Sequence, residues 1–79
     1  MREIEVLGSG CPKCQYLERV VREVVASAGI EAVVRHVADD REIVARGVLA
    51  TPGLAIDGRV VSAGRIPTRD QIAAWLVPA

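Results

Sequence analysis

Cys11 and Cys14 are the two cysteines of this 79-residue chain, and they are separated by Pro12 and Lys13. They stand where residues 3–7, which alternate between apolar and polar side chains, give way to a helical pattern. Two thiols one helical turn apart can form a disulfide with each other, or they can bind a soft metal ion together. The spacing therefore predicts either electron exchange or metal capture.

The start of the helix favours a reactive thiol at Cys11. Pro12 suits the first helical position, because its fixed φ is helical and its missing N–H would have no partner there. Cys11 is then the N-cap, with its sulfur near the free N–H groups of Lys13 and Cys14. These donors and the helix dipole favour the thiolate, and the charge of Lys13, whose side chain we expect to point to solvent, adds little. Cys14 lies deeper in the turn, so we expect Cys11 to attack a disulfide and Cys14 to resolve the intermediate.

Composition narrows the class of protein. Ten basic residues balance ten acidic ones without a run of like charge, so neither a nucleic-acid site nor an electrostatic membrane site is expected. The chain opens at Met1 without an apolar leader, and no segment approaches the roughly 20 apolar residues of a membrane span. We expect one domain over residues 1–79, a monomer in the cytoplasm. In that compartment paired cysteines are more often catalytic or metal-binding than structural.

Hydrophobic periodicity and turn signals divide the chain into seven elements. They are a strand over residues 3–7, a helix from Pro12 to a stop at Gly29, a strand over residues 31–37, a short helix after Asp39, two strands joined at Asp57-Gly58, and a helix after Thr68. The order β-α-β-α-β-β-α predicts an α/β fold, a four-stranded mixed sheet flanked by three helices. The helical crossover between the first two strands makes them parallel, and the last two form a hairpin.

Thr51 and Pro52 precede that hairpin. Together with the strand, the Gly-Ser-Gly-Cys-Pro-Lys-Cys segment, the helix and the final helix, they make essentially the whole chain resemble the thioredoxin superfamily. It looks most like the small glutaredoxin-like thioredoxins, also called the redox-active disulfide protein 2 family. The resemblance implies a thioredoxin-like fold and a thiol–disulfide oxidoreductase without a cofactor. Its partners would be protein disulfides and an upstream thiol reductant. It also implies that Pro52 is cis beside the disulfide and that Thr51 offers backbone hydrogen bonds to an extended substrate.

The chain departs from the wider superfamily at several positions. Gly10 stands where thioredoxins have a tryptophan before the first cysteine, and Pro12-Lys13 replaces their Gly-Pro. From the sequence alone, no acidic residue can be assigned to the buried carboxylate that moves a proton in thioredoxin. Gly64 is not followed by the pattern with which glutaredoxins hold glutathione. The sequence therefore leaves the identity of the thiol reductant open.

Two other functions remain alternatives. The cysteine loop is similar to that of heavy-metal-associated copper chaperones, although their β-α-β-β-α-β order ends on a strand and this chain ends on a helix. A regulator that uses the dithiol only as a sensor is the second alternative. His36 is expected to be an exposed or edge-strand side chain and not a metal ligand. Tyr16 either borders the cysteines or helps to cover the core.

Overall fold

The computed structural model describes residues 1–76. The elements are β1 (Arg2–Leu7), α1 (Pro12–Ala28), β2 (Ala32–Val37), α2 (Asp40–Ala45), β3 (Gly53–Ile56), β4 (Arg59–Ala63) and α3 (Arg69–Leu76). This is the order predicted from the sequence. The longest helix, α1, has 17 residues, and no helix in the described part of the chain is long and apolar enough to cross a membrane.

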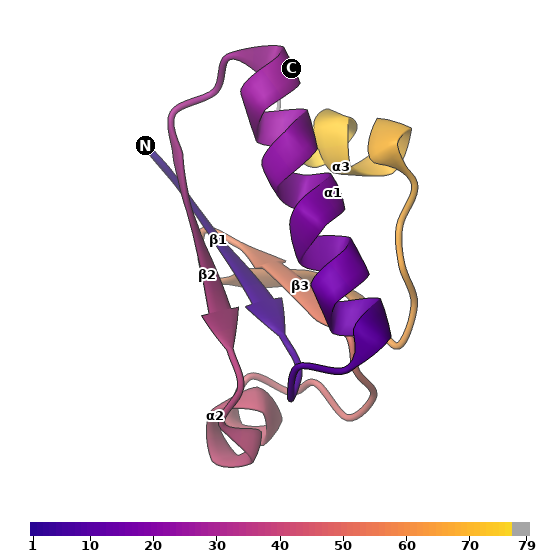
Figure 1. Ribbon diagram of the computed structural model, residues 1–79. Helices are drawn as coiled ribbons and strands as arrows, with labels where there is room; N and C mark the ends of the chain where they lie inside the picture. The colour runs from indigo at the N-terminus through magenta and orange to yellow at the C-terminus, as the bar shows by residue number, and fades with distance from the viewer. Residues whose placement is uncertain (77–79) are drawn as a thin grey trace.

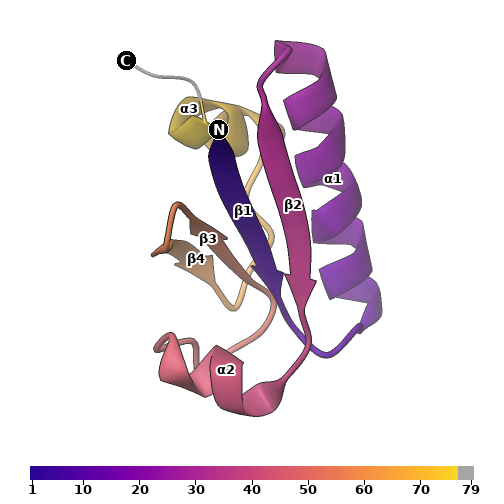
Figure 2. The same cartoon turned by 90° about the vertical axis from the view of Figure 1, so that its left-hand side faces the viewer.

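The strands form one sheet in the order β2-β1-β3-β4, as Figures 1 and 2 show. β1 and β2 are parallel, whereas β3 is antiparallel to both β1 and β4. The predicted mixed sheet is confirmed, and β1 is one of its two central strands. Because β1 leads directly into the cysteine loop, that loop is attached to the interior of the sheet and not to a free edge.

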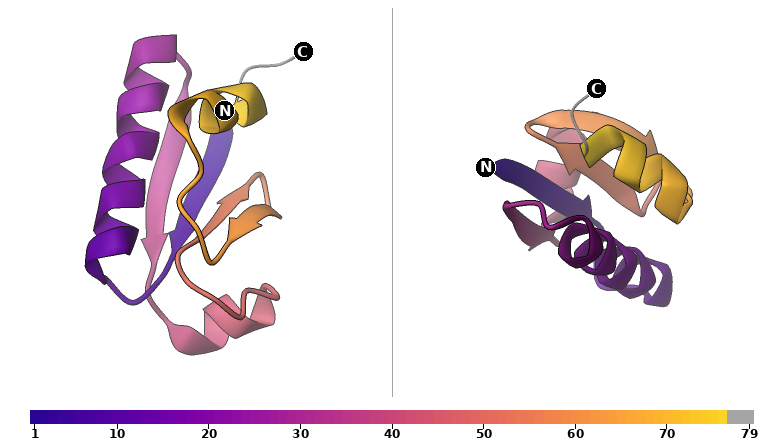
Figure 3. Two further views of the ribbon diagram at one scale, coloured as in Figure 1. Left: turned by 90° about the vertical axis from the view of Figure 1, so that its right-hand side faces the viewer. Right: turned by 90° about the horizontal axis from the view of Figure 1, so that it is seen from above.

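Alternate side chains of β1 enter two separate cores. Ile4 and Val6 pack with α1 and α3 in the larger core, and Leu7 packs with Ile43 of α2 in the smaller one. α1 runs alongside the strands, while α3 lies at the end of the sheet where the chain begins (Figure 3). α2 lies at the opposite end, beyond the tips of β1 and β2 (Figure 2). The cysteine loop and the chain that leaves α2 therefore share one end of the molecule.

Capping residues set the ends of the two longer helices. Cys11 is the N-cap of α1 with Pro12 in its first turn, and Gly29 ends the helix in the left-handed conformation at φ 65°. Before α3, the Gln71 backbone N–H donates to Thr68 Oγ1 at 3.1 Å, and the Thr68 N–H donates to Gln71 Oε1 at 3.0 Å. This reciprocal pair is a capping box. Both helix starts were predicted from sequence, because capping depends on neighbouring residues only.

A buried ion pair ties α2 to the central strand. Glu5 of β1 is only 6% exposed, and its carboxylate accepts two hydrogen bonds from the Arg46 guanidinium, one of them 2.9 Å long. Arg35 of β2 lies 3.7 Å from the same carboxylate. Arg46 is the C-cap of α2. The pair therefore anchors the point from which the chain leaves α2 toward Thr51.

Candidate active site

The two cysteines face each other at the start of α1. Cys11 has extended backbone angles, φ −66° and ψ 162°, and its sulfur accepts a hydrogen bond from the Cys14 backbone N–H at 3.3 Å. Both thiols are free, and their sulfur atoms lie 2.6 Å apart. Two-electron oxidation of the pair, with loss of two protons, would join these neighbouring atoms in a disulfide bond of about 2.05 Å. The N-cap position predicted for Cys11 is confirmed.

Hydrogen bonds to its sulfur lower the pKa of Cys11. The largest contribution is the hydrogen bond from the Cys14 thiol, followed by those from the backbone N–H groups of Cys14 and Lys13. The Lys13 and Pro12 side chains point into solvent. Lys13 therefore acts on the thiol through its backbone N–H. Pro12 contributes the helix start that aims these donors at the sulfur.

Cys14 has the opposite environment. It is 1% exposed, and this burial raises the pKa of its thiol. Its hydrogen bond to the Cys11 sulfur and the charge of that sulfur raise the pKa further. Cys11, in contrast, is partly exposed. The pair therefore combines an accessible sulfur that favours the thiolate with a buried sulfur that favours the thiol.

Gly8 provides the space that the buried sulfur occupies. A Cβ atom placed on Gly8 would lie 2.2 Å from Cys14 Sγ, which is far inside van der Waals contact. The Gly8 backbone is also fixed, because its N–H donates to Val37 O of β2 at 2.9 Å. Only glycine fits at this position with Cys14 where it is.

The chain between α2 and β3 brings Thr51 and Pro52 to the same place. A Cβ atom on Gly8 would lie 3.7 Å from Thr51 Cβ, so this loop lies against the cysteine loop. Pro52 is buried and Thr51 is exposed, and the peptide bond between them is cis, as the family resemblance implied. The Gly64 N–H donates to Pro52 O at 2.9 Å and holds the loop from the side of β4.

Comparison with known proteins agrees with this geometry. The family described as the thioredoxin domain matches residues 2–77. The chain belongs to the thioredoxin domain family. A thioredoxin from Methanothermobacter thermautotrophicus is 38% identical over 72 residues, which cover 91% of this chain and 94% of the relative. A thioredoxin from Methanocaldococcus jannaschii is 41% identical over 69 residues, covering 87% of this chain and 79% of the relative.

Membership of the thioredoxin family identifies the chain as a thiol–disulfide oxidoreductase. The Cys-Pro-Lys-Cys segment and the mixed sheet predicted from sequence are both part of this thioredoxin-like structure. The metal-binding alternative gains no support from the comparisons. Within residues 1–76, moreover, no three His, Cys, Asp or Glu side chains gather in a way that could hold a metal ion.

Two further side chains contact the cysteine loop of this thioredoxin-type site. His36 Nε2 lies 2.7 Å from Gly8 O, and Gln15 Nε2 donates to Gly10 O at 3.1 Å. From the sequence His36 was expected to be an exposed or edge-strand residue, and both its exposure and its edge position are confirmed. Its contact with the cysteine loop was not predicted, because the two segments are far apart in sequence. Parallel pairing places His36 of β2 opposite Val6 of β1, just before the loop.

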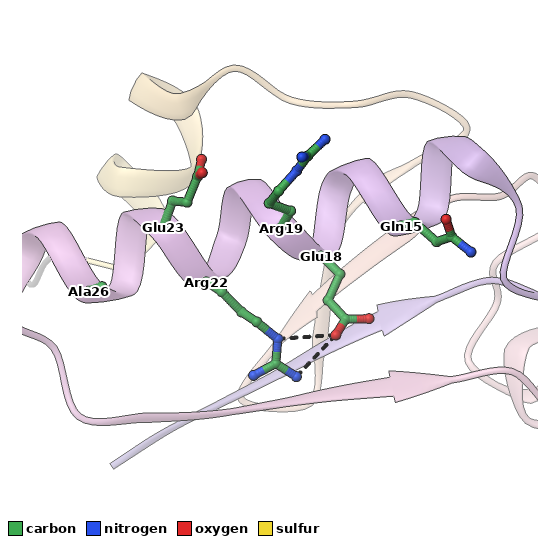
Figure 4. Close-up of a pocket in the computed structure, with 6 residues that line it drawn as sticks. All are labelled: Gln15, Glu18, Arg19, Arg22, Glu23 and Ala26. Carbon is green, nitrogen blue, oxygen red and sulfur yellow. Dashed lines mark hydrogen bonds and ion pairs between the residues drawn. The ribbon is translucent and has the colours of Figure 1, made fainter.

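A shallow groove along the outer face of α1 is not part of the thioredoxin-type site. Six residues line it, as Figure 4 shows: Gln15, Glu18, Arg19, Arg22, Glu23 and Ala26. Two charged side chains of the groove form an ion pair, in which Arg22 Nε donates a hydrogen bond to Glu18 Oε2 at 3.0 Å. The face of α1 that carries Tyr16 is partly solvated as well, with Arg19 stacked 5.8 Å from the centre of the Tyr16 ring.

Proposed function

We propose that this thioredoxin-family protein exchanges electrons with protein disulfides, with Cys11 as the nucleophile and Cys14 as the resolving thiol. The observation that carries the assignment is the unequal environment of the two sulfurs. Cys11 is partly exposed and its pKa is lowered by hydrogen bonds from Cys14 and the backbone, whereas Cys14 is 1% exposed and its pKa is raised by burial. A thiolate is the attacking species in thiol–disulfide exchange, so the accessible thiolate attacks first.

The reaction proceeds in two exchanges. The Cys11 thiolate attacks one sulfur of the substrate disulfide, and the other substrate sulfur leaves as a thiolate that takes a proton from solvent. Cys14 then loses its proton and attacks Cys11 Sγ, which releases the second substrate thiol. The substrate gains two electrons and two protons, and Cys11 and Cys14 become a disulfide. An upstream thiol reductant returns this disulfide to the dithiol.

The first exchange itself prepares Cys14 for the second. Before reaction, the hydrogen bond to the Cys11 sulfur and the negative charge of that sulfur both add to the effect of burial and keep the Cys14 proton in place. In the mixed disulfide the Cys11 sulfur is no longer a thiolate, so its charge and its strength as an acceptor are lost. Cys14 therefore becomes easier to deprotonate at the moment when its attack is needed.

Exposed groups around the dithiol suit a protein substrate. Thr51 is exposed beside the cysteine loop, so its backbone can pair with an extended segment. Leu49, two residues earlier, is 88% exposed, and Tyr16, two residues after Cys14, is 47% exposed. Covering exposed apolar side chains of this kind with a partner is favourable.

We also propose that the protein is a monomer with a single domain and that it acts in the reducing cytosol. In that compartment thiol reductants keep such a cysteine pair in the dithiol form.

Two serine variants test the assignment of roles. We expect Cys11→Ser to abolish reduction of an insulin disulfide, because no nucleophile remains at the exposed position. We expect Cys14→Ser to accumulate a mixed disulfide between Cys11 and the substrate, visible by mass spectrometry. An unchanged rate in the Cys11 variant, or a mixed disulfide on Cys14 in that variant, would refute the assignment.

The direction of electron flow is open to a separate measurement. Two-cysteine oxidoreductases with this general chemistry span reduction potentials of about −270 to −120 mV, from reductants to strong oxidants. Equilibration of the Cys11–Cys14 pair with glutathione or dithiothreitol buffers gives its potential directly. A value near the lower end supports reduction of protein disulfides, and a value near the upper end supports their formation.

A further inference from the structure

His36 reaches the cysteine loop from the neighbouring strand. It lies on β2, and its Nε2 atom is 2.7 Å from Gly8 O. Because a carbonyl oxygen can only accept a hydrogen bond, Nε2 must carry the proton and donate it. The Gly8 N–H already donates to Val37 O at 2.9 Å. Both polar backbone groups of Gly8 are therefore held by the end of β2.

The other ring nitrogen of His36 faces an acidic side chain of α1. Nδ1 lies 3.9 Å from Glu18 Oε1, and Arg22 holds the other oxygen of that carboxylate at 3.0 Å. Arg22 also donates to Val34 O on the free edge of β2 at 3.2 Å. Glu18 and Arg22 both project from α1 toward the sheet (Figure 4). A continuous chain of polar contacts thus runs from β2 through α1 and His36 to Gly8.

The hydrogen bond between His36 and Gly8 affects the two sulfur atoms indirectly, through the backbone of the cysteine loop. The Gly8 Cα packs so closely on Cys14 that a Cβ there would lie 2.2 Å from Cys14 Sγ. His36 Cε1 would in turn lie 3.9 Å from a Cβ on Gly10, the residue before Cys11. His36 therefore lies against the loop at Gly8 and near Gly10, two positions that both precede Cys11.

We propose that His36 is a positioning residue for the dithiol, holding the segment Gly8–Gly10 so that Cys14 stays packed on Gly8 and Cys11 stays at the helix N-cap. The expected effect of His36 on the rate of disulfide reduction rests on the proposed role of Cys11 as nucleophile. Its expected effect on the Gly8–Gly10 segment is independent of that role. Glu18 lies next to the other side of the ring, and Arg22 holds Glu18 in place.

Two substitutions at His36 test the hydrogen bond to Gly8 O. His36→Leu removes the donor, and His36→Gln keeps an N–H donor. We expect His36→Leu to accelerate amide hydrogen exchange in Gly8–Gly10 and to slow disulfide reduction about fivefold, equivalent to one lost neutral hydrogen bond. We expect His36→Gln to restore both properties to within about twofold of the wild type.

The pH profile of Cys11 alkylation by iodoacetamide is a second readout, which a loss of stability alone would not shift. Hydrogen bonds at the helix start lower the pKa of Cys11, so a looser Gly8–Gly10 segment should weaken them. We expect His36→Leu to move the profile to higher pH and His36→Gln to leave it near that of wild type. The proposal is overturned if His36→Leu leaves hydrogen exchange and the alkylation profile as in wild type. It is also overturned if Leu and Gln variants are impaired equally and in proportion to lost stability.

The same experiments distinguish this inference from the proposed catalytic roles. Amide hydrogen exchange in Gly8–Gly10 can be measured in a Cys11→Ser variant, which carries out no thiol–disulfide exchange. If adding His36→Leu to this variant accelerates amide hydrogen exchange, the positioning role is supported whichever cysteine attacks. Alkylation of Cys14 before Cys11 in wild type would instead contradict the catalytic assignment while leaving the loop measurement intact.

Discussion

Cys14 Sγ packs directly on the backbone of Gly8, at a point where a Cβ on Gly8 would be 2.2 Å from the sulfur. The first residue after β1 and the Cys14 thiol are therefore in such close contact that residue 8 has no room for a side chain. Gly8 is buried, so a larger residue could not turn its side chain out into solvent without moving the loop. The contact links the end of β1 to the chemistry at the start of α1.

Gly8→Ala should consequently damage the site more than it damages the fold. We expect a loss of about 1–3 kcal/mol in the free energy of unfolding from overpacking, and a fall in disulfide reduction of roughly tenfold to a hundredfold because Cys14 is displaced. Urea denaturation and an insulin reduction assay measure the two effects. Ser9→Ala, in the exposed part of the same loop, is the matched control and should change neither property.

The Cys14 thiol should control the reactivity of Cys11. The hydrogen bond from that thiol is the largest cause of the lowered Cys11 pKa. Cys14→Ala removes the donor, so we expect the pH profile of Cys11 alkylation by iodoacetamide to move to higher pH. Cys14→Ser retains a hydroxyl donor and should move it less. Identical profiles for the two variants would show that the backbone N–H groups alone activate Cys11.

Removing one partner of the Glu5–Arg46 ion pair should destabilise the fold, because Glu5 is 6% exposed and its charge would lose its nearest partner. Arg46→Met leaves the Glu5 carboxylate buried with only the longer contact to Arg35, and we expect it to cost about 3 kcal/mol in the free energy of unfolding. Replacing both partners, Glu5→Met with Arg46→Met, should recover most of the loss. A double variant as unstable as the single one would contradict this account.

The same ion pair should make the free energy of unfolding depend on pH. The hydrogen bonds from Arg46 hold the pKa of Glu5 below its ordinary value, because they outweigh the opposing effect of burial. A carboxyl whose folded-state pKa is lowered stabilises the protein above its unfolded-state pKa of about 4.3, and the stabilisation is lost as pH falls through the folded value. The stability difference between wild type and Glu5→Gln should therefore shrink between pH 7 and pH 3. A difference that is constant over this range would exclude the mechanism.

Gly64 should support the loop that carries Thr51. Its φ is +77°, and a Cβ there would lie 3.0 Å from Ala50 Cβ. Gly64→Ala should cost about 1–2 kcal/mol from the left-handed backbone and should also push Ala50 and Thr51 away from the cysteines. Gly58→Ala is the matched control, because Gly58 has φ +82° and no atom within 4 Å of the added Cβ.

We therefore expect both alanine variants to lose similar stability, while only Gly64→Ala raises the KM for a protein disulfide. A small disulfide that does not need the Thr51 backbone should be reduced at nearly the wild-type rate by both variants. Equal activity of the two variants toward the protein substrate would show that the position of Ala50 does not matter to the site.

Features that depend on neighbouring residues were predictable from the sequence. The N-cap position of Cys11, the first-turn position of Pro12 and the Thr68–Gln71 capping box follow from local helix geometry, which a few consecutive residues determine. The order of the elements likewise followed from periodicity and turn residues. The proximity of Thr51-Pro52 to the cysteines was implied only by resemblance to a family, because no local rule joins positions so far apart.

Contacts between distant segments were decided by the tertiary structure. Strand alternation allowed a polar residue at position 5, but it could not show that Glu5 would be buried against Arg46, since that depends on where α2 ends. Nor could the sequence show that His36 would bond Gly8, because that contact follows from the register of β1 and β2.

The sequence by itself therefore determined a dithiol at a helix N-terminus and limited its chemistry to electron exchange or metal capture. The fold decided how unequal the two thiols are and what holds them in place. The physical reason is that a helix cap is built from adjacent residues, whereas burial of Cys14 and support of Gly8 require strands that meet only when the sheet has formed.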